Sequence, residues 1–103
     1  MPGMRHDDRM VFNRLVFRVH AIQRMFQRGI DADAVRHALT TGEVIERYSS
    51  DTPYPSYLVL GWRGSRPIHV VAADNVASNE TIIITVYEPE SEQWESDFRR
   101  RKA

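Results

Sequence analysis

The chain changes its pattern of apolar and polar positions near Gly42. Before this glycine, apolar residues recur at intervals of three and four, as on one face of an α-helix. After it they recur at every second position, as in a half-buried strand. Short connections between the later segments favour antiparallel neighbours. The pattern therefore predicts an α+β domain in which two N-terminal helices pack on a four-stranded antiparallel sheet, in the order ααββββ.

The first predicted helix contains His20 and ends at Gly29. At 100° per residue, one side of it is apolar and the other carries basic and amide side chains. The apolar side holds Ala21, Ile22, Met25 and Phe26, and the other side holds His20, Gln23, Arg24, Gln27 and Arg28. A second helix is predicted over 31–41, because Asp31 is a favourable N-cap and Gly42 ends the periodicity. The segment 11–19 fits a helix or a short strand over 15–19, and we prefer the helix.

The four strands are expected over 44–48, 56–62, 68–73 and 81–87. Regular alternation along the last strand places Thr81, Ile83, Thr85 and Tyr87 on one face. The predicted core is made of apolar residues from both helices and three strands: Ile22, Met25, Phe26, Val35, Leu39, Leu58, Leu60, Ile68, Val70, Ile82 and Ile84. If Phe26 is buried in this way, Phe26→Ala should cost about 3–5 kcal/mol of stability.

The 103 residues suit one domain, which we expect to span 14–89. Residues 1–13 are predicted to form an N-terminal arm, and residues 90–103 a C-terminal tail in which Trp94 and Phe98 anchor a short helix before a frayed end. The absence of cysteine excludes disulfides and thiolate chemistry. There is also no signal peptide and no apolar run near the ~20 residues of a membrane span, so a cytoplasmic location is expected.

Charge is segregated along the chain although the net charge is zero. Residues 1–42 carry a net charge of +3, residues 43–98 carry −7 and residues 99–103 carry +4. Four arginines and no acid lie between Arg14 and Arg28. This basic segment can meet an anion, or it can be an ordinary solvated helix face.

Several separated motifs resemble those of one family. The motifs are His20-Ala21, Arg24-Met25, Arg28-Gly29-Ile30, Gly42-Glu43-Val44-Ile45-Glu46, Ser56-Tyr57-Leu58, Ile68-His69-Val70-Val71 and Ile84-Thr85-Val86-Tyr87. Together they resemble a widespread bacterial family of small domains of unknown function. Members look like ribonuclease toxins of the RelE and MqsR type, so the resemblance implies a RelE- or barnase-like fold. It also implies a small zinc-finger or helix-turn-helix partner that looks like an antitoxin. Many members have Ser two residues before the histidine, where this chain has Arg18.

Metal-independent RNA cleavage requires a base for the 2′-hydroxyl, cations for the phosphate and an acid for the leaving oxygen. His20 can exchange protons near neutral pH, and Arg24 and Arg28 follow it on one helix face with guanidiniums that suit phosphate. Thr85 and Tyr87 offer hydroxyls on the last strand. We therefore predict that His20, Arg24, Arg28, Thr85 and Tyr87 form one catalytic site where the helix crosses the sheet edge.

Each candidate also has a purely structural interpretation. His20 can flank a helix start, and the two arginines can pair with Glu43 and Glu46 across the seam between helix and sheet. His69 lies in an apolar strand and is expected to be a core or cross-strand residue. No metal-ligand spacing and no phosphate-binding glycine loop occurs, so we expect neither a metal nor a cofactor.

Two functions therefore stay open at this point. The first is a toxin-like, metal-independent endoribonuclease of a bacterial toxin-antitoxin pair, with RNA as its substrate. The second is a non-catalytic protein-binding module. An antitoxin-like partner fits both functions.

Overall fold

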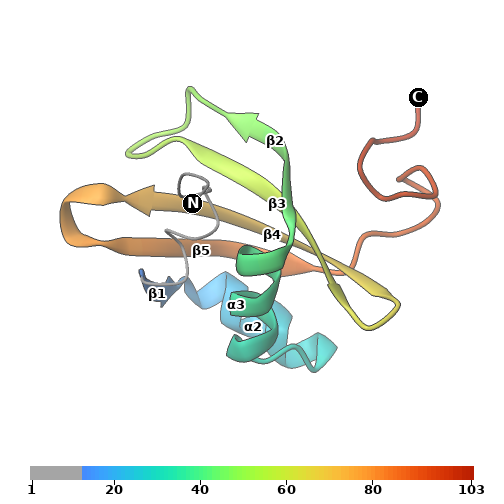
Figure 1. The fold of residues 1–103 in the computed structure, drawn as a ribbon, viewed down its shortest axis with the longest axis horizontal. Coiled ribbons are helices and arrows are strands. Elements are labelled where there is room, and N and C mark those ends of the chain that lie inside the picture. The colour runs from blue at the N-terminus through green and yellow to red at the C-terminus, as the bar shows by residue number, and fades with distance from the viewer. Residues whose placement is uncertain (1–12) are drawn as a thin grey trace, which may run out of the picture.

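The computed structural model describes residues 13–103 and shows two helices on one side of a five-stranded mixed sheet (Figure 1). The elements are β1 (Arg14–Phe17), α2 (Val19–Arg28), α3 (Ala32–Thr41), β2 (Glu43–Tyr48), β3 (Ser56–Arg63), β4 (Arg66–Asn75), the 3-10 turn η1 (Val76–Ser78) and β5 (Glu80–Tyr87). The order of strands in the sheet is β1-β5-β4-β3-β2. The N-terminal arm predicted over 1–13 lies outside the described residues except for Asn13, whose Nδ2 donates to Thr81 Oγ1 at 2.9 Å.

The four predicted strands are present, and each pairs antiparallel with its neighbour, as expected. The prediction of a helix before His20 is wrong for the described part of 11–19, because Arg14–Phe17 forms a fifth strand. β1 pairs parallel to β5, with Leu15 opposite Thr81 and Phe17 opposite Ile83. A strand of four residues is too short for its periodicity to distinguish it from one helical turn. The sheet is therefore mixed, and not antiparallel throughout.

The second helix lies directly on the sheet. Asp31 caps α3 as predicted, since its Oδ1 accepts the Ala34 N–H at 2.8 Å. Gly61 lies inside β3 beneath Ala38. A side chain at Gly61 would collide with the Ala38 backbone and Cβ, so this glycine allows α3 to approach the strand closely.

Most of the predicted core is confirmed. The buried members are Met25, Val35, Leu39, Leu58, Leu60, Ile68, Val70 and Ile82. Ile84 is only partly buried, because it is the extra residue of a β-bulge in β5. Ile22 and Phe26 are not buried.

The bulge at Ile84 reverses the alternation of side chains along β5. Before it, Ile83 pairs with Ala72, and both belong to the core beneath the helices. After it, Thr85 pairs with Val71 and therefore points to the opposite face. The prediction that Ile83 and Thr85 share one face is wrong for this reason.

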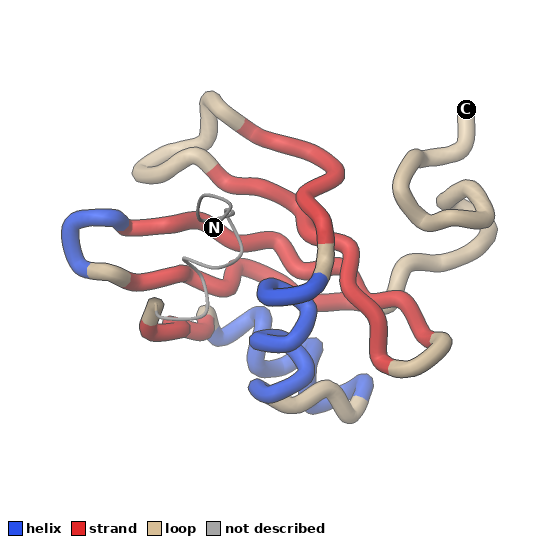
Figure 2. The backbone as a smooth tube through the Cα atoms, viewed as in Figure 1, coloured by secondary structure: helices blue, strands red, loops and turns tan. Residues whose placement is uncertain are grey.

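The C-terminal segment 88–103 covers part of the face opposite the helices, as turns and loops (Figure 2). Trp94 is only 2% exposed, and its ring lies against the buried His69 with centroids 4.4 Å apart. Trp94 also forms an isolated β-bridge with Arg101, whose guanidinium lies 4.6 Å from the indole centroid. The predicted short helix is absent from this segment, and its basic end is held through Arg101, because a buried tryptophan fixes the tail.

Candidate functional site

α2 has a weak cap at its N-terminus and a favourable one at its C-terminus. Its N-cap, Arg18, has extended backbone angles and makes no side-chain capping bond. Many members of the family that the sequence resembles have serine at this position. Its C-cap, Gly29, is in the left-handed conformation at φ 65°, which glycine adopts without a steric penalty. The Ile30 N–H donates to Met25 O at 2.9 Å, and the Ile30 side chain is buried. The predicted C-cap is therefore confirmed.

The side of α2 that faces the sheet is narrow. Ala21 and Met25, one helical turn apart, are buried in the core with residues of β5. The predicted burial of Ile22 and Phe26 is wrong, since they are 52% and 88% exposed. Each of them follows a buried residue by one position, which turns it 100° around the helix and away from the core. α3 packs on β3 and β4 and leaves this flank of α2 uncovered.

An apolar row consequently lies on the surface of α2. It consists of Val19, Ile22 and Phe26, at spacings of three and four, and we call it the α2 stripe. Val19 is 70% exposed, so all three members are largely accessible to solvent. Burial of a phenylalanine side chain stabilises a fold by roughly 1.5–3 kcal/mol. Because Phe26 is 88% exposed, it contributes almost none of this free energy.

His20 and Arg24 are exposed on the side of α2 that points away from Ile22 and Phe26. Arg28, at the end of the helix, approaches Glu88, with Nη1 4.0 Å from Oε1. Pairing of Arg24 or Arg28 with Glu43 and Glu46 across the seam is not observed. Those two carboxylates instead contact the C-terminal segment: Glu43 Oε1 accepts from Arg99 Nε at 2.6 Å, and Glu46 Oε2 lies 3.6 Å from Arg101 Nε.

Thr85 and Tyr87 lie on the other side of the sheet from α2. Tyr87 is opposite His69 in the register, and its Oη lies 3.2 Å from His69 Nδ1. Its neighbour Val86 points to the core beneath the helices, so Tyr87 points away from them. The structure thus brings His20, Arg24 and Arg28 to one helix and places Thr85 and Tyr87 on the opposite face. A catalytic role for any of the five stays a prediction.

His69 is a buried cross-strand residue, as predicted. Its Nε2 lies 2.9 Å from Phe98 O, and since a carbonyl can only accept, Nε2 carries the proton. Nδ1 of the neutral ring then accepts the hydrogen bond of the Tyr87 hydroxyl. Burial lowers the pKa of His69 below 6.5 and raises the pKa of Tyr87 above 10.0. This pair therefore binds the C-terminal segment to the sheet in its neutral form.

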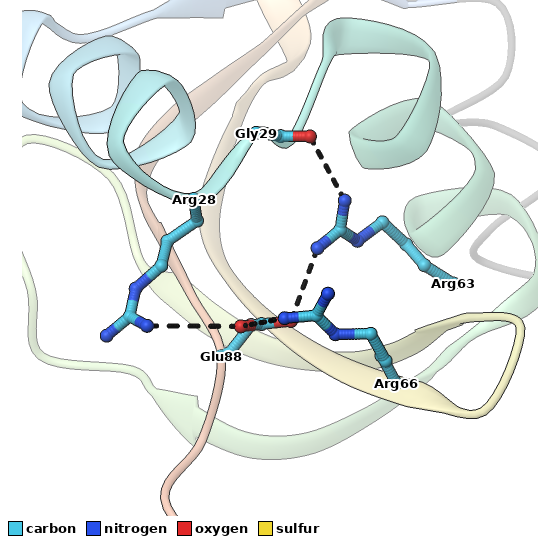
Figure 3. A network of polar contacts seen from close by, with 5 residues as sticks. All are labelled: Arg28, Gly29, Arg63, Arg66 and Glu88. Carbon is cyan, nitrogen blue, oxygen red and sulfur yellow. Dashed lines mark hydrogen bonds and ion pairs between the residues drawn. The ribbon is translucent and has the colours of Figure 1, made fainter.

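Three arginines gather around Glu88, directly after β5 (Figure 3). They are Arg28 from α2, Arg63 at the end of β3 and Arg66 at the start of β4. The sequence prediction included only Arg28 of this group. The register offers a signal for the others, because the β3–β4 turn and the last residue of β5 lie at the same end of the sheet. Antiparallel pairing alone therefore places Arg63 and Arg66 near Glu88.

Comparison with known proteins identifies a family whose model matches most of the fold. The family described as "Domain of unknown function (DUF4258)" matches residues 17–88, which is more than half of the chain. The chain belongs to this family. The match begins at the last residue of β1 and ends at Glu88, so it includes both helices and strands β2 to β5. No curated protein and no solved structure is significantly similar to the chain.

Membership of the DUF4258 family confirms the resemblance found in the sequence as far as the family itself. The likeness to RelE- and MqsR-type toxins stays a resemblance. Within residues 13–103, no three histidine, aspartate or glutamate side chains are grouped so that they could hold a metal ion. In the same part of the chain, no helix has the length and apolar character needed to cross a membrane.

Proposed function

We propose that this domain is a protein-binding module and that its contact surface is the α2 stripe. The observation that carries the proposal is the exposure of Phe26, at 88%, in line with Val19 and Ile22. Apolar anchors at positions i, i+3 and i+7 of one helix are the spacing with which helices pack against each other. A stripe of this kind gains free energy only when a partner covers it.

The charges of α2 indicate the partner. The chain from Arg14 to Ile30 contains no acidic residue, the exposed Arg18 directly precedes the stripe, and Arg24 adds a further exposed positive charge to the same helix. A positively charged helix with an apolar row is complementary to an amphipathic helix whose own apolar row is flanked by aspartate and glutamate. We therefore assign to the stripe an acidic amphipathic helix of a partner protein.

The proposal can be tested with model helices that share one apolar row and differ only in their flanking residues. Three fluorescent peptides, flanked by glutamate, glutamine or lysine, are titrated with the full chain. The glutamate peptide should bind most tightly, and Phe26→Ser should weaken it at least about tenfold, as the loss of one buried phenylalanine implies. Val76→Ser is the matched control, because Val76 is also apolar and 69% exposed but lies in η1.

Equal binding of the three peptides, or equal binding by the Phe26→Ser protein, would contradict the proposal. Dimerisation of the free chain that Phe26→Ser abolishes would assign the stripe to a second copy instead. Nuclear Overhauser effects between the Phe26 ring and residues 1–12 would assign it to the chain's own amino-terminal segment.

A second candidate function is a toxin-like, metal-independent endoribonuclease in the cytoplasm of a bacterium. The observation that favours it is the exposed row of His20 and Arg24 with Arg28 at the end of the same helix. On this proposal the α2 stripe is where a zinc-finger or helix-turn-helix antitoxin-like partner docks. Thr85 and Tyr87 would have to act from the other face of the sheet. The catalytic residues of this candidate function are therefore those of α2.

Induced expression in bacteria separates the two candidates. A ribonuclease should arrest growth, cleave labelled RNA in the presence of a chelator, and lose both effects in His20→Ala. A binding module should be tolerated, and purified protein should leave the RNA intact. Exposed His37 on α3 provides the control substitution, His37→Ala, which should change neither result.

A further inference from the structure

The cluster around Glu88 has more positive charge than its carboxylate can neutralise (Figure 3). Arg66 Nη2 lies 2.8 Å from the carboxylate, Arg63 Nη2 lies 3.2 Å from it, and Arg28 Nη1 lies 4.0 Å from it. Among residues 13–103, no second carboxylate forms an ion pair with these arginines. Three guanidiniums thus face one carboxylate, and the N–H donors of the exposed Arg66 that do not bind Glu88 remain for another anion.

The three arginines are held to different degrees. Arg63 is 24% exposed and also donates from Nη1 to Gly29 O at 3.1 Å, so its position is fixed from two sides. Its Nε is buried and has no hydrogen-bond partner among residues 13–103. Arg66 is 64% exposed, and an ion pair so open to water contributes little stability. Arg66 can therefore turn part of its guanidinium to a ligand while Arg63 and Arg28 remain with Glu88.

A pocket of about 280 Å³ lies next to this cluster, between the β3–β4 turn and the C-terminal segment. Arg66 and Glu88 line one part of it, and the hydroxyl-bearing Ser65 and Ser91 line another. Phe98 gives the pocket an aromatic wall. Charged, hydroxyl and aromatic groups together are what a phosphate joined to a flat ring system requires.

The backbone at Phe98 is strained in a way that fixes this wall. Its φ is 59°, in the left-handed region that bulky residues rarely adopt. Two hydrogen bonds hold it there: its N–H donates to Glu95 O at 2.8 Å, and its carbonyl accepts from His69 Nε2. Its ring also meets Trp62 edge to face, with centroids 6.2 Å apart. Backbone strain of this kind concentrates at ligand sites.

We propose that this pocket binds a nucleotide. Arg66 donates two hydrogen bonds to the phosphate, Ser65 and Ser91 donate from their hydroxyls, and the base lies against the Phe98 ring. The volume is just below the ~300 Å³ at which small-molecule sites begin, so it suits a single nucleotide and not a longer ligand held entirely inside. The site is separate from the α2 stripe, and either can fail without the other.

The test is a titration of the ¹⁵N-labelled full chain, followed by NMR at constant ionic strength. The three ligands are adenosine monophosphate, inorganic phosphate and O-phosphoserine. Saturable shifts should appear at the backbone amides that border the pocket, those of Ser65, Arg66, Glu88, Glu90 and Ser91. Adenosine monophosphate should bind at least about tenfold more tightly than the other two, because only it has a base to stack on an aromatic ring.

Two substitutions separate the phosphate contact from the base contact. Arg66→Gln should weaken all three ligands about tenfold, since it removes the charged phosphate donor. Phe98→Leu should bring adenosine monophosphate to the level of inorganic phosphate without changing the latter. Arg47→Gln, at an exposed position of β2, makes the same change of charge and should leave every affinity unchanged.

Three results would overturn the proposal. The first is the absence of saturable shifts at the pocket. The second is equal weakening by Arg66→Gln and Arg47→Gln, which would show unspecific attraction between charges. The third is phosphoserine binding as tightly as the nucleotide, which would remove the base contact. Arg66 is exposed at the start of β4, so its replacement leaves the fold intact and keeps the test decisive.

Discussion

α2 and α3 have ten residues each and lie on the same side of the sheet, yet they use their apolar residues differently. α3 buries Val35, Ala38 and Leu39 almost completely. α2 buries only Ala21 and Met25 and leaves the three residues of the α2 stripe exposed. α3 is thus bound to the sheet by most of its apolar surface, whereas α2 leaves a large part of its apolar surface exposed to solvent.

The ends of the two helices differ in the same sense. Asp31 caps α3 with a side-chain hydrogen bond, while Arg18 leaves the first turn of α2 without one. Amphipathic spacing therefore shows that a helix forms, but it does not show which of its apolar residues face the protein's own core. A helix with a weak cap and a surplus of apolar residues is where a binding surface is to be sought.

The largest expected effect lies in α3. Leu39→Ala should lower the free energy of unfolding by about 2–5 kcal/mol, because Leu39 is 1% exposed and its removal leaves a cavity. Urea unfolding followed by circular dichroism measures this. Val76→Ala, at an exposed apolar position, is the control and should change little. A loss below about 1 kcal/mol would show that α3 is not the anchored helix.

Acid should weaken the face of the sheet away from both helices. Burial lowers the pKa of His69, so the folded state favours the neutral ring. The stability this contributes is complete above pH 6.5 and is lost as the pH falls through the lowered pKa, at up to about 1.4 kcal/mol per pH unit.

Unfolding free energies at pH 7.5, 6.5 and 5.5 measure the effect of acid. His69→Phe should flatten the fall, whereas His37→Asn, at an exposed position of α3, should preserve it. Hydrogen exchange should rise first around Trp94 and not in α3. An unchanged slope in His69→Phe would assign the pH dependence to another group.

The caps should respond with opposite signs. Asp31→Ala removes the bond to the Ala34 N–H and should destabilise the fold by about 1 kcal/mol. Arg18→Ser supplies the missing cap of α2 and should stabilise it by up to about 1 kcal/mol. Thermal unfolding measures both shifts. If Arg18→Ser lowered the melting temperature, the arginine itself would have a structural role at the start of α2.

The smallest effect on stability is expected at the residue with the largest expected effect on binding. Phe26→Ala should change the free energy of unfolding by no more than about 0.5 kcal/mol, since the ring is exposed. The value of about 3–5 kcal/mol that burial would require does not apply. Urea unfolding at two protein concentrations checks this, and a loss above 1 kcal/mol would place the ring against other residues of the chain.

Local patterns in the sequence predicted most of the fold. The four antiparallel strands, the second helix with its Asp31 cap and the end of the first helix at Gly29 follow from spacing and from the special roles of single residues. β1 did not follow, because four residues cannot establish a period and its partner β5 is distant in the chain. The bulge at Ile84 did not follow either. Ile84 follows two other isoleucines, and nothing in the sequence distinguishes the extra residue of a bulge from an ordinary strand residue there.

The same limits apply to the candidate site. Regular alternation placed Thr85 on the wrong face because one inserted residue inverts every later position of a strand. The exposure of Phe26 depends on how α2 is rotated over β5, and apolar spacing permits more than one rotation. The arginines around Glu88 come from three elements: strand pairing brings Arg63 and Arg66 to Glu88, but Arg28 joins them only through the packing of α2 on the sheet.

The position of β1 also bears on the order in which the chain assembles. Arg14 and Glu80, which face each other in the parallel pair, are 66 residues apart, so this pairing closes the largest loop in the sheet. Closing it has the highest entropic cost, and no partner exists for β1 until β5 has formed. The amino-terminal strand should therefore be the last to join the sheet and the first to detach from it, and α2, which follows it after one residue, should loosen at the same time.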